Sequence, residues 1–294
     1  MIERIHDSDQ SRIAKVLEYY RSSDESSRGY KEGELMGRAH WGFNPDLDSK
    51  ELYDLQTALI NMELLLGNTL NLPQGSRVLD AGCGFGKVAD TLRTRFGLDV
   101  MGIDLSHKRL VIASELNKKR QVDMASVTGG VSLSEANYHR LPFPDGCFDG
   151  AFTMETLVHA NPVEDVLAEF LRVLKPGGRL ALFETSIPDL STVPGIVRKY
   201  ASGVIERSAQ YSLPRFTHEA FPGLLAEAGF ENIEVTDISK NVYPTWRHLW
   251  LDALKGNVYR VLHGSLSFPA STYIYLARKH LGYKVCSANK PTMT

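Results

Sequence analysis

The sequence predicts an α/β protein built around a doubly wound, mostly parallel sheet. From Gly75 to about residue 186, short apolar runs with strand character alternate with segments whose apolar residues recur at helical spacing. A glycine-rich turn, Gly82 to Gly86, joins the first strand of this stretch to its first helix. Strands that alternate with helices form parallel sheets with helices on both faces.

Two helices are expected before this alternation begins. Ile13, Val16, Leu17 and Tyr20 recur at helical spacing and predict an amphipathic helix over residues 9–21. Residues 22–34 are polar and indicate a loop. A second helix is expected over residues 50–66, ending at Gly67.

The alternating region contains four expected strands, at residues 77–81, 100–104, 148–154 and 179–183. The helices between them are expected over residues 87–96, from about residue 108, and over residues 163–174. For the last helix, Asn161 is the expected cap, Pro162 suits the first turn and Glu164 completes a capping box. The run Lys175-Pro-Gly-Gly should end it.

The last third of the chain has weaker patterns. A helix is expected over residues 221–228, and strands over residues 233–238 and 283–288. Residues 243–281 are rich in aromatic side chains and suggest a cover over the active site. The chain therefore divides into an N-terminal helical segment (1–74), a ligand-binding core (75–186), and the rest of the sheet with an inserted cover (187–294).

Composition excludes several classes of function. The 294 residues include 33 basic and 35 acidic side chains, a formal net charge of -2, which is unlike a nucleic-acid-binding or polybasic membrane-binding surface. Three cysteines are too few and too scattered for a disulfide framework or a zinc site, and no metal site is expected. No signal peptide or membrane span is predicted, so a cytoplasmic protein is expected. The N-terminal helix is a candidate for packing on a second subunit.

The most informative motif is Val78-Leu-Asp-Ala-Gly-Cys-Gly-Phe-Gly86. Glycines after a strand let the backbone approach a ligand, and the following helix offers free N–H groups. The dinucleotide pattern G-x-G-x-x-G would need glycine at Lys87. Asp104, at the end of the next strand, is placed to accept both ribose hydroxyls of an adenosine. The alternatives are an ordinary tight turn and a helix-capping aspartate.

With Gly102-Ile-Asp-Leu-Ser106, Leu141 to Asp149 and Leu171 to Gly178, this motif resembles the class I S-adenosylmethionine-dependent methyltransferases. Two further segments, Met154 to Ala160 and His40 to Asp46, are similar to the sterol and tocopherol C-methyltransferase branch. The resemblance implies a Rossmann-like sheet of seven strands with the last antiparallel, and S-adenosyl-L-methionine as cofactor.

The resemblance also implies roles for individual residues. Asp80, Gly82 and Gly84 would lie against the methionine part of the cofactor, Asp104 would bind the ribose and Leu105 would flank the adenine. Asn137 stands where the family often has an acid near the adenine amino group. The expected cofactor site is completed by Cys83, Gly86 and Tyr138.

Glu155 and His159 are expected to face the acceptor, on one helical face if their segment is helical. They and His40 are the candidate catalytic residues, and a surface Glu–His pair or a core histidine is the alternative. An apolar acceptor pocket could be lined by Tyr19, Tyr20, Trp41, Phe43, Tyr243 and Trp246, for which core packing is the alternative.

These candidates favour methyl transfer to a small molecule, leaning to C-methylation of a prenyl, terpenoid or sterol-like acceptor. The rival is O- or N-methylation of a phenolic or amine natural product, since one core supports both. An NAD-dependent oxidoreductase is disfavoured by the glycine spacing. A cofactor-holding scaffold that catalyses another reaction stays open.

Overall fold

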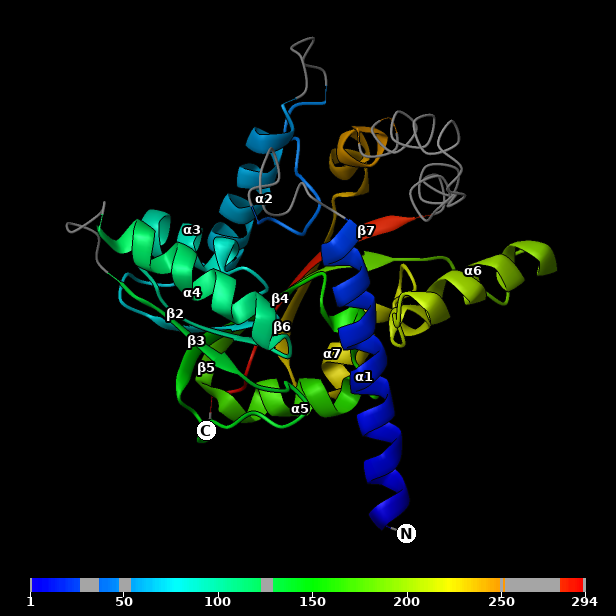
Figure 1. The fold of residues 1–294 in the computed structure, drawn as a ribbon, viewed down its shortest axis with the longest axis horizontal. Coiled ribbons are helices and arrows are strands. Elements are labelled where there is room, and N and C mark those ends of the chain that lie inside the picture. The colour runs from blue at the N-terminus through cyan, green and yellow to red at the C-terminus, as the bar shows by residue number, and fades with distance from the viewer. Residues whose placement is uncertain are drawn as a thin grey trace.

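The computed structural model describes residues 2–26, 37–47, 54–122, 129–248, 251 and 281–292. Its centre is a seven-stranded sheet with the order β3-β2-β1-β4-β5-β7-β6 (Figure 1). The strands are β1 (Arg77–Ala81), β2 (Asp99–Asp104), β3 (Val131–Glu135), β4 (Phe148–Met154), β5 (Leu174–Ser186), β6 (Glu231–Asp237) and β7 (Gly282–Asn289). β7 pairs antiparallel with β5 and β6, and the other pairs are parallel. The predicted doubly wound sheet is confirmed.

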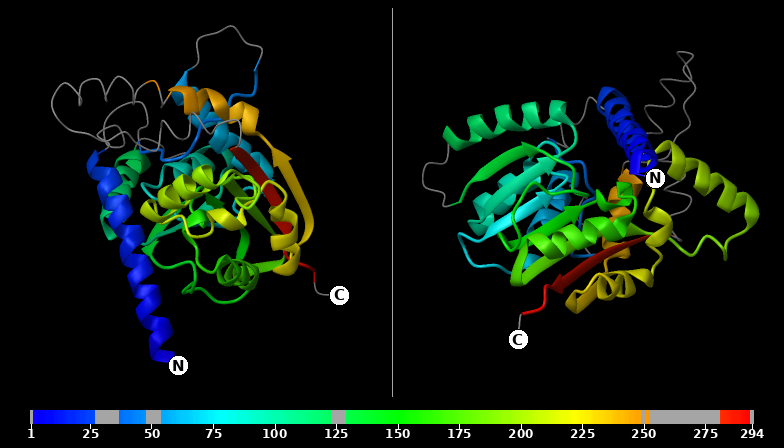
Figure 2. Two further views of the ribbon diagram at one scale, coloured as in Figure 1. Left: turned by 90° about the vertical axis from the view of Figure 1, so that its right-hand side faces the viewer. Right: turned by 90° about the horizontal axis from the view of Figure 1, so that it is seen from below.

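Helices cover both faces of this sheet (Figure 2). They are α1 (Ile2–Ser26), α2 (Leu55–Leu70), α3 (Lys87–Phe96), α4 (His107–Val122), α5 (Val163–Val173), α6 (Gly195–Arg207), α7 (Ala220–Glu227), the 3-10 turns η2 (Leu157–His159) and η3 (Leu213–Arg215), and a helix over residues 239–248. Buried apolar side chains of α2, α3 and the 239–248 helix form one core cluster. Those of α5 and α7 form the other. The sheet is thus buried on both faces, as parallel sheets are.

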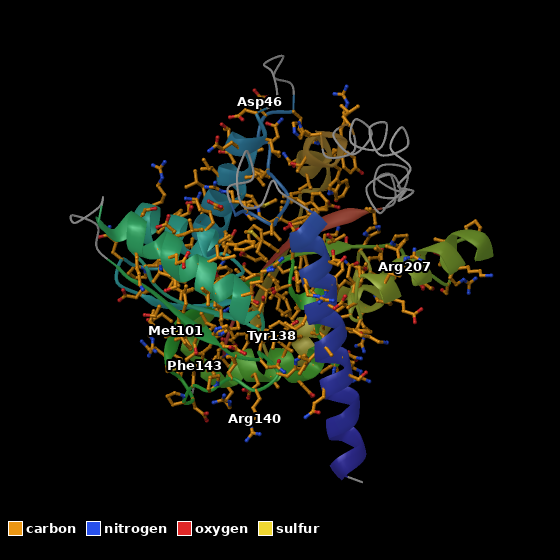
Figure 3. The ribbon with its side chains drawn as sticks, in the orientation of Figure 1. Asp46, Met101, Tyr138, Arg140, Phe143 and Arg207 are labelled. Atoms are coloured by element: carbon orange, nitrogen blue, oxygen red, sulfur yellow. The ribbon has the colours of Figure 1, made fainter. Side chains whose placement is uncertain are left out.

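Side chains follow this layering. Tyr138 lies among the packed side chains of the interior in Figure 3, whereas Arg140 and Arg207 point outward. α1 runs along one side of the sheet, and its N-terminal end extends beyond the body of the molecule (Figures 1 and 2). Among the described residues, no helix combines the length and apolar character needed to cross a lipid bilayer.

The register of the central strands places the two sequence motifs side by side. Asp80 pairs with Gly102 and Ala81 pairs with Ile103, so β1 and β2 end at the same edge of the sheet. The glycine turn follows β1 and Asp104 ends β2. Ligands of open α/β sheets bind outside the carboxyl ends of the strands.

α2 does not end at Gly67 as predicted but continues to Leu70, where Asn71 adopts a left-handed conformation with φ 46°. Gly67 is needed for packing, because a Cβ at this position would clash with the ring of Phe96. Its absence of a side chain therefore lets α2 and α3 approach closely, and it does not mark the helix end.

The predicted cap of α5 is also wrong. The N-cap is Pro162, and no side chain caps the helix. The backbone N–H of Asn161 instead donates to Nε2 of His139 at 3.0 Å. Asn161 therefore belongs to the loop before the helix and does not cap it. The helix ends at Val173 and β5 begins at once, so Lys175 to Gly178 lie within the strand.

The elements β3 and α6 and the helix over residues 239–248 were not predicted. β3 contains alternating serines and is only partly buried, so it lacks the apolar run of its neighbours. α6 extends away from the sheet (Figure 1), and its apolar residues recur at helical spacing, at Ile196, Val197, Tyr200, Ala201, Val204 and Ile205.

α1 spans Ile2–Ser26, longer than the expected helix over 9–21, so the expected loop cannot begin at residue 22. The expected loop from residue 27, the start of the expected 50–66 helix and most of the expected 243–281 cover lie outside the described residues.

Candidate functional site

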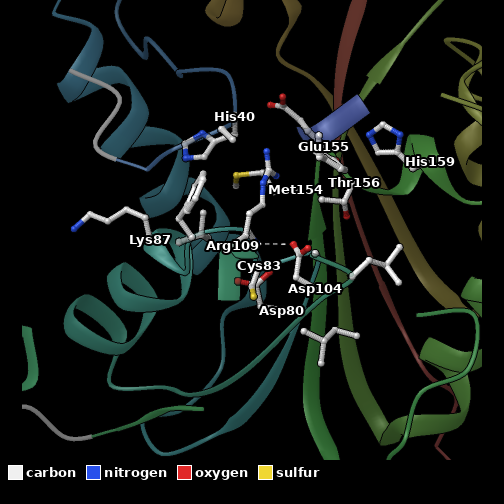
Figure 4. Close-up of a pocket in the computed structure, with 18 of the residues that line it drawn as sticks. His40, Asp80, Cys83, Lys87, Asp104, Arg109, Met154, Glu155, Thr156 and His159 are labelled. Carbon is white, nitrogen blue, oxygen red and sulfur yellow. Dashed lines mark hydrogen bonds between the residues drawn. The ribbon is translucent and has the colours of Figure 1, made fainter. Parts of the chain in front are cut away.

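A cleft opens at the carboxyl edge of β1, β2 and β4 (Figure 4). Its floor comes from the glycine turn and the ends of β1 and β2, and its far wall from the segment after β4. Val16 and Tyr20 of α1 close one side.

The glycine turn forms the floor because three of its residues adopt positive φ angles. Gly82, Gly84 and Gly86 have φ values of 103°, 53° and 69°. A Cβ at Gly82 would lie 2.7 Å from Cβ of Thr156, whereas a Cβ at Gly84 would meet only a guanidinium nitrogen at 3.9 Å. Gly82 therefore allows close packing of two turns, and Gly84 leaves open space for a ligand. Gly86 is not among the described residues that line the cleft.

Asp104 is fixed by backbone amides at both carboxylate oxygens. Oδ2 accepts from the N–H of Gly84 at 2.8 Å, and Oδ1 accepts from the N–H of Ser106 at 2.8 Å. Each carboxylate oxygen has a second lone pair, so both can also accept from vicinal hydroxyls. This geometry suits the predicted contact with a ribose.

Asp80 lies in the cleft wall and is 3% exposed. Its Oδ2 has no hydrogen-bond partner within the described part of the chain. Burial, and then the charge of nearby Asp104, raise the pKa of Asp80 well above its ordinary value. A buried carboxyl with an unsatisfied oxygen is costly unless a ligand donates to it. The ammonium group of the cofactor's methionine part fits this requirement.

The remaining predicted cofactor residues divide into two groups. Cys83, Leu105 and Tyr138 line the cleft, and the Tyr138 hydroxyl donates to the carbonyl of Thr156 at 3.1 Å. Asn137 is not among the described lining residues, and its Oδ1 accepts from the N–H of His139 at 3.0 Å. Its predicted contact with adenine remains a prediction.

Glu155 begins the far wall in a left-handed conformation, with φ 59°. One carboxyl oxygen accepts from the Trp41 N–H at 2.7 Å and from the Tyr283 hydroxyl at 2.8 Å. The residue is partly exposed and lines the cleft, and these two donors hold one oxygen of its carboxyl. Burial, reinforced by the charge of Glu184, raises its pKa to about 8. Glu155 therefore carries a proton at neutral pH.

His159 lies at the end of the 3-10 turn and is 8% exposed. Its Nδ1 lies 2.9 Å from the carbonyl oxygen of Ala209. A carbonyl only accepts, so Nδ1 carries the hydrogen and Nε2 keeps a lone pair. Burial, and then the positive charge of Arg109, lower the pKa of His159 to about 4. The imidazole is thus neutral, with one tautomer fixed.

Glu155 and His159 do not share a helical face as predicted, because the positive φ of Glu155 separates it from the turn that carries His159. Both nevertheless line the same cleft. Glu184 of β5, which was not predicted, supports this turn: Oε1 accepts from the N–H groups of Thr156 at 3.1 Å and Leu157 at 2.8 Å. Burial raises the pKa of Glu184 to about 8.

His40 lines the cleft, but its geometry argues against a role as base. Nδ1 lies 2.9 Å from the carbonyl oxygen of Trp41, and Nε2 lies 3.3 Å from a carboxylate oxygen of Glu63. Glu63 is buried and also accepts from Arg38 at 2.6 Å. Because both ring nitrogens of His40 face acceptors, both are placed to donate.

The six aromatic candidates also divide. Tyr20 lines the cleft, and the rings of Tyr19 and Tyr20 lie 5.7 Å and 5.1 Å from the His159 ring. The others pack together against the core cluster of α2 and α3: Trp41, Phe43, Tyr243 and Trp246. This packing favours the structural alternative for those four side chains.

Sequence reasoning missed Thr156 and Arg109. The hydroxyl of Thr156 donates to the carbonyl of Ala81 at 2.8 Å and so joins the two turns. Arg109 lines the cleft and is 4% exposed. Its place in the first turn of α4, three residues after Ser106, was the available signal, because that turn faces the carboxyl edge of the sheet.

Comparison with known proteins agrees with this geometry. Residues 79–182 match a family model described as a methyltransferase domain. The S-adenosyl-L-methionine-dependent Diels-Alderase iccD of Talaromyces variabilis is 32% identical over 288 residues, covering 94% of this chain and 95% of that protein. The O-methyltransferase resE of Aspergillus sclerotiorum is 32% identical over 75% of this chain and 78% of its own length.

Solved structures share the fold. Geranyl diphosphate C-methyltransferase from Streptomyces coelicolor A3(2) has a TM-score of 0.70 at 17% identity, covering 95% of this chain and 98% of that one. The [4+2]-cyclase SpnF has a TM-score of 0.68 at 23% identity, covering 87% and 88%. Relatives that are 32% identical align over 94% and 75% of this chain, and the chain therefore belongs to the S-adenosylmethionine-dependent methyltransferases that act on small molecules.

Proposed function

We propose that this enzyme methylates a hydroxyl oxygen of a small natural product, with His159 as the proton acceptor. The observation that carries the proposal is the fixed tautomer of His159. Its Nδ1 donates to Ala209, so the lone pair of Nε2 is the one available toward the cleft. The names of curated relatives such as resE, rstn1 of Aspergillus nomiae and cnsE of Penicillium expansum support oxygen as the acceptor atom.

The mechanism follows from these positions. When bound, S-adenosyl-L-methionine supplies an electrophilic methyl group. Asp104 and Asp80 would hold its ribose and methionine parts beside Gly84. Nε2 of His159 would accept the hydroxyl proton as the oxygen–methyl bond forms, and Glu184 keeps the turn of His159 in place through two amides. Positioning of this kind and general base catalysis each contribute to rate.

C-methylation of an alkene is less well supported. It creates a carbocation, which needs a carboxylate or an open aromatic face nearby. Glu155 is protonated at neutral pH, and the Arg109 guanidinium already lies 4.1 Å from the centre of the Tyr20 ring. Membership of the sterol and tocopherol branch, and a prenyl or terpenoid acceptor, therefore remain predictions.

The test uses S-adenosyl-L-methionine with a fully deuterated methyl group and a panel of phenolic, enolic, prenyl and amine acceptors. The expected product carries three deuteriums on an oxygen, located by tandem mass spectrometry. Loss of one deuterium would show that a carbocation was quenched from the new methyl group, and would replace this proposal by alkene methylation.

A second candidate function is acceleration of an intramolecular [4+2] cycloaddition. The observation that favours it is coverage: the Diels-Alderase aligns over 94% of this chain, whereas the O-methyltransferases resE and rstn1 align over 75% and 69%. The protonated carboxyl of Glu155 could donate to a carbonyl of the substrate. S-adenosylhomocysteine separates the two functions, because it would support cycloaddition and abolish methyl transfer.

A further inference from the structure

Glu155 lies on the side of the cleft away from the two aspartates proposed to hold the cofactor. Its backbone N–H donates to the carbonyl of Phe183 on β5 at 2.8 Å, and its carboxyl contacts Tyr283 on β7. In the sheet, β5 and β7 lie on one side of β4, whereas β1 and β2, which carry Asp80 and Asp104, lie on the other. Figure 4 shows the same separation between the Glu155 carboxyl and these aspartates. Glu155 is therefore placed toward the acceptor end of the cleft.

The two carboxyl oxygens of Glu155 have different surroundings. Oε1 accepts from the Trp41 N–H at 2.7 Å and from the Tyr283 hydroxyl at 2.8 Å, which occupies both of its lone pairs. Oε2 forms no hydrogen bond within the described part of the chain, yet it is not a buried atom. Because Glu155 is partly exposed and lines the cleft, Oε2 is the oxygen that a ligand can reach.

No positive charge compensates this carboxyl. Across the described ranges, neither Glu155 nor nearby Glu184 forms an ion pair, and the charge that acts on Glu155 is the second carboxyl. A carboxylate in such surroundings is costly, and two neighbouring carboxylates repel each other. Burial, and then the Glu184 charge, raise the pKa of Glu155 to about 8. Glu155 is thus a neutral acid, whose proton resides on Oε2 because both lone pairs of Oε1 are occupied.

The backbone holds Glu155 in this position at a conformational cost. Its φ of 59° lies in the left-handed region that residues with a Cβ seldom adopt. Such residues concentrate at ligand sites, where surrounding contacts keep them in place. The contacts here come from Trp41 and Tyr283, 114 residues before and 128 residues after Glu155. This arrangement favours a ligand contact over a purely structural role for the side chain.

We propose that Oε2 of Glu155 donates a hydrogen bond to a carbonyl oxygen of the acceptor, so that the enzyme selects hydroxyl compounds that also carry a carbonyl group. Phenolic ketones and the enols of 1,3-dicarbonyl compounds belong to this class. The hydroxyl part rests on the proposed O-methylation, whereas the carbonyl contact does not. Glu155 keeps its proton throughout. Where the carbonyl is conjugated with the hydroxyl, this bond makes the hydroxyl a stronger acid and so suits the weak base His159.

Glu155→Gln distinguishes a donor from a carboxylate. The carboxamide reproduces the neutral acid, because its oxygen can accept from Trp41 and Tyr283 while its NH2 group donates in place of Oε2. It cannot act as a base or stabilise a cation by charge. Glu155→Met has a side chain of similar length that cannot donate. A donor role predicts that Gln preserves acceptor binding and Met weakens it, whereas a carboxylate role predicts that both variants weaken it.

The probes are the ortho, meta and para isomers of methoxyacetophenone, which resemble methylated products and do not ionise. Each is paired with the ethylanisole of the same substitution, which lacks the carbonyl oxygen. Binding to the enzyme loaded with S-adenosylhomocysteine is measured by NMR titration at pH 6. The wild type should bind at least one ketone about tenfold more tightly than its paired ethylanisole. Glu155→Gln should retain this preference, Glu155→Met should lose it, and exposed Glu206→Met is the control.

A pH series gives a second readout. In the wild type, the preference for the ketone should decrease between pH 6 and pH 9, because an ionised Glu155 cannot donate. In Glu155→Gln it should not change with pH. The other titratable or charged groups around this part of the cleft are the same in both proteins: Glu184, Tyr283, Tyr19, His159, His40 and Arg109. The difference between the two pH series therefore reports on Glu155.

Three results would overturn the inference: no preference for any ketone in the wild type, loss of the preference in Glu155→Gln, or its retention in Glu155→Met. If Glu155→Met does not fold, the wild type and Glu155→Gln compared across pH still decide. Affinity for S-adenosylhomocysteine verifies that each variant is folded. Because no measurement needs turnover, failure of methyl transfer would refute the proposed function separately.

Discussion

The two ends of the cleft are built in different ways. At the cofactor end, backbone geometry forms the site: Gly82 and Gly84 have positive φ, and two amides hold Asp104. At the acceptor end, buried ionisable side chains are held by residues far away in sequence. Glu155 is fixed by Trp41 and Tyr283, and His159 by Ala209. Substitutions of side chains can therefore change the acceptor pocket while the backbone that binds the cofactor stays the same.

The largest effect should come from the acceptor end. His159→Gln removes the proposed proton acceptor and should lower turnover about 10²- to 10⁴-fold, which is the usual contribution of a general base. Affinity for S-adenosylhomocysteine, measured by calorimetry, should not change. Exposed His107→Gln is the control. If His159→Gln also lowered the affinity for S-adenosylhomocysteine, the acceptor end and the cofactor end would not act independently.

Asp104→Ala tests the cofactor end. Two charge-assisted hydrogen bonds to the ribose, at about 1.5 kcal/mol each, correspond to about 100-fold weaker binding of S-adenosylhomocysteine. Titration calorimetry measures this, with thermal unfolding to verify that the variant is folded. An affinity equal to that of the wild type would refute the ribose contact.

Gly82 and Gly84 offer a matched pair. Gly82→Ala forces a Cβ against Thr156, where the two ends meet, and should reduce the free energy of unfolding by about 2–3 kcal/mol. In Gly84→Ala the new Cβ meets open space, so the free energy of unfolding should fall by only about 1 kcal/mol, because of the positive φ. This variant should nevertheless weaken cofactor binding more than Gly82→Ala does. Urea unfolding and calorimetry separate the two effects. Equal losses of stability would contradict this distinction.

The last prediction concerns the dependence of stability on pH. The pKa of Glu155 is raised from 4.5 to about 8 in the folded protein, so the folded state binds its proton more tightly than the unfolded state does. Its contribution to stability is complete below pH 4.5 and decreases as the pH rises toward 8. Glu155→Gln should flatten this decline by up to about 1.4 kcal/mol per pH unit.

Urea unfolding at pH 5, 6 and 7 measures the slope, with exposed Glu206→Gln as control. Glu184, whose pKa is also about 8, should maintain part of the decline in the single variant. A slope identical to that of the wild type would mean that Glu155 is ionised in the folded protein.

The same contrast explains what the sequence could predict. Gly82, Gly84 and Asp104 follow their strands directly, so local pattern places them at one edge of the sheet. His159 and Glu155 were found by resemblance, but their geometry depends on a positive φ and on Ala209 and Tyr283, which no local pattern connects to them. Trp246 was predicted to line the acceptor pocket but lies in the core. Its part of the sequence has no clear pattern, and an aromatic residue there suits a pocket or a core equally well. Arg109 was missed because a single arginine on a helix usually faces solvent.

The antiparallel strand β7 also affects the order in which the protein can be assembled during synthesis. The strands that form the cofactor end, β1, β2 and β4, all precede residue 155, whereas Tyr283 lies on β7, 128 residues after Glu155. A nascent chain leaves the ribosome from its N-terminus, and folding follows that order. The binding floor for the cofactor can thus form while translation continues. The hydrogen bond from Tyr283 that fixes Glu155 forms only after translation has reached β7, 128 residues beyond Glu155.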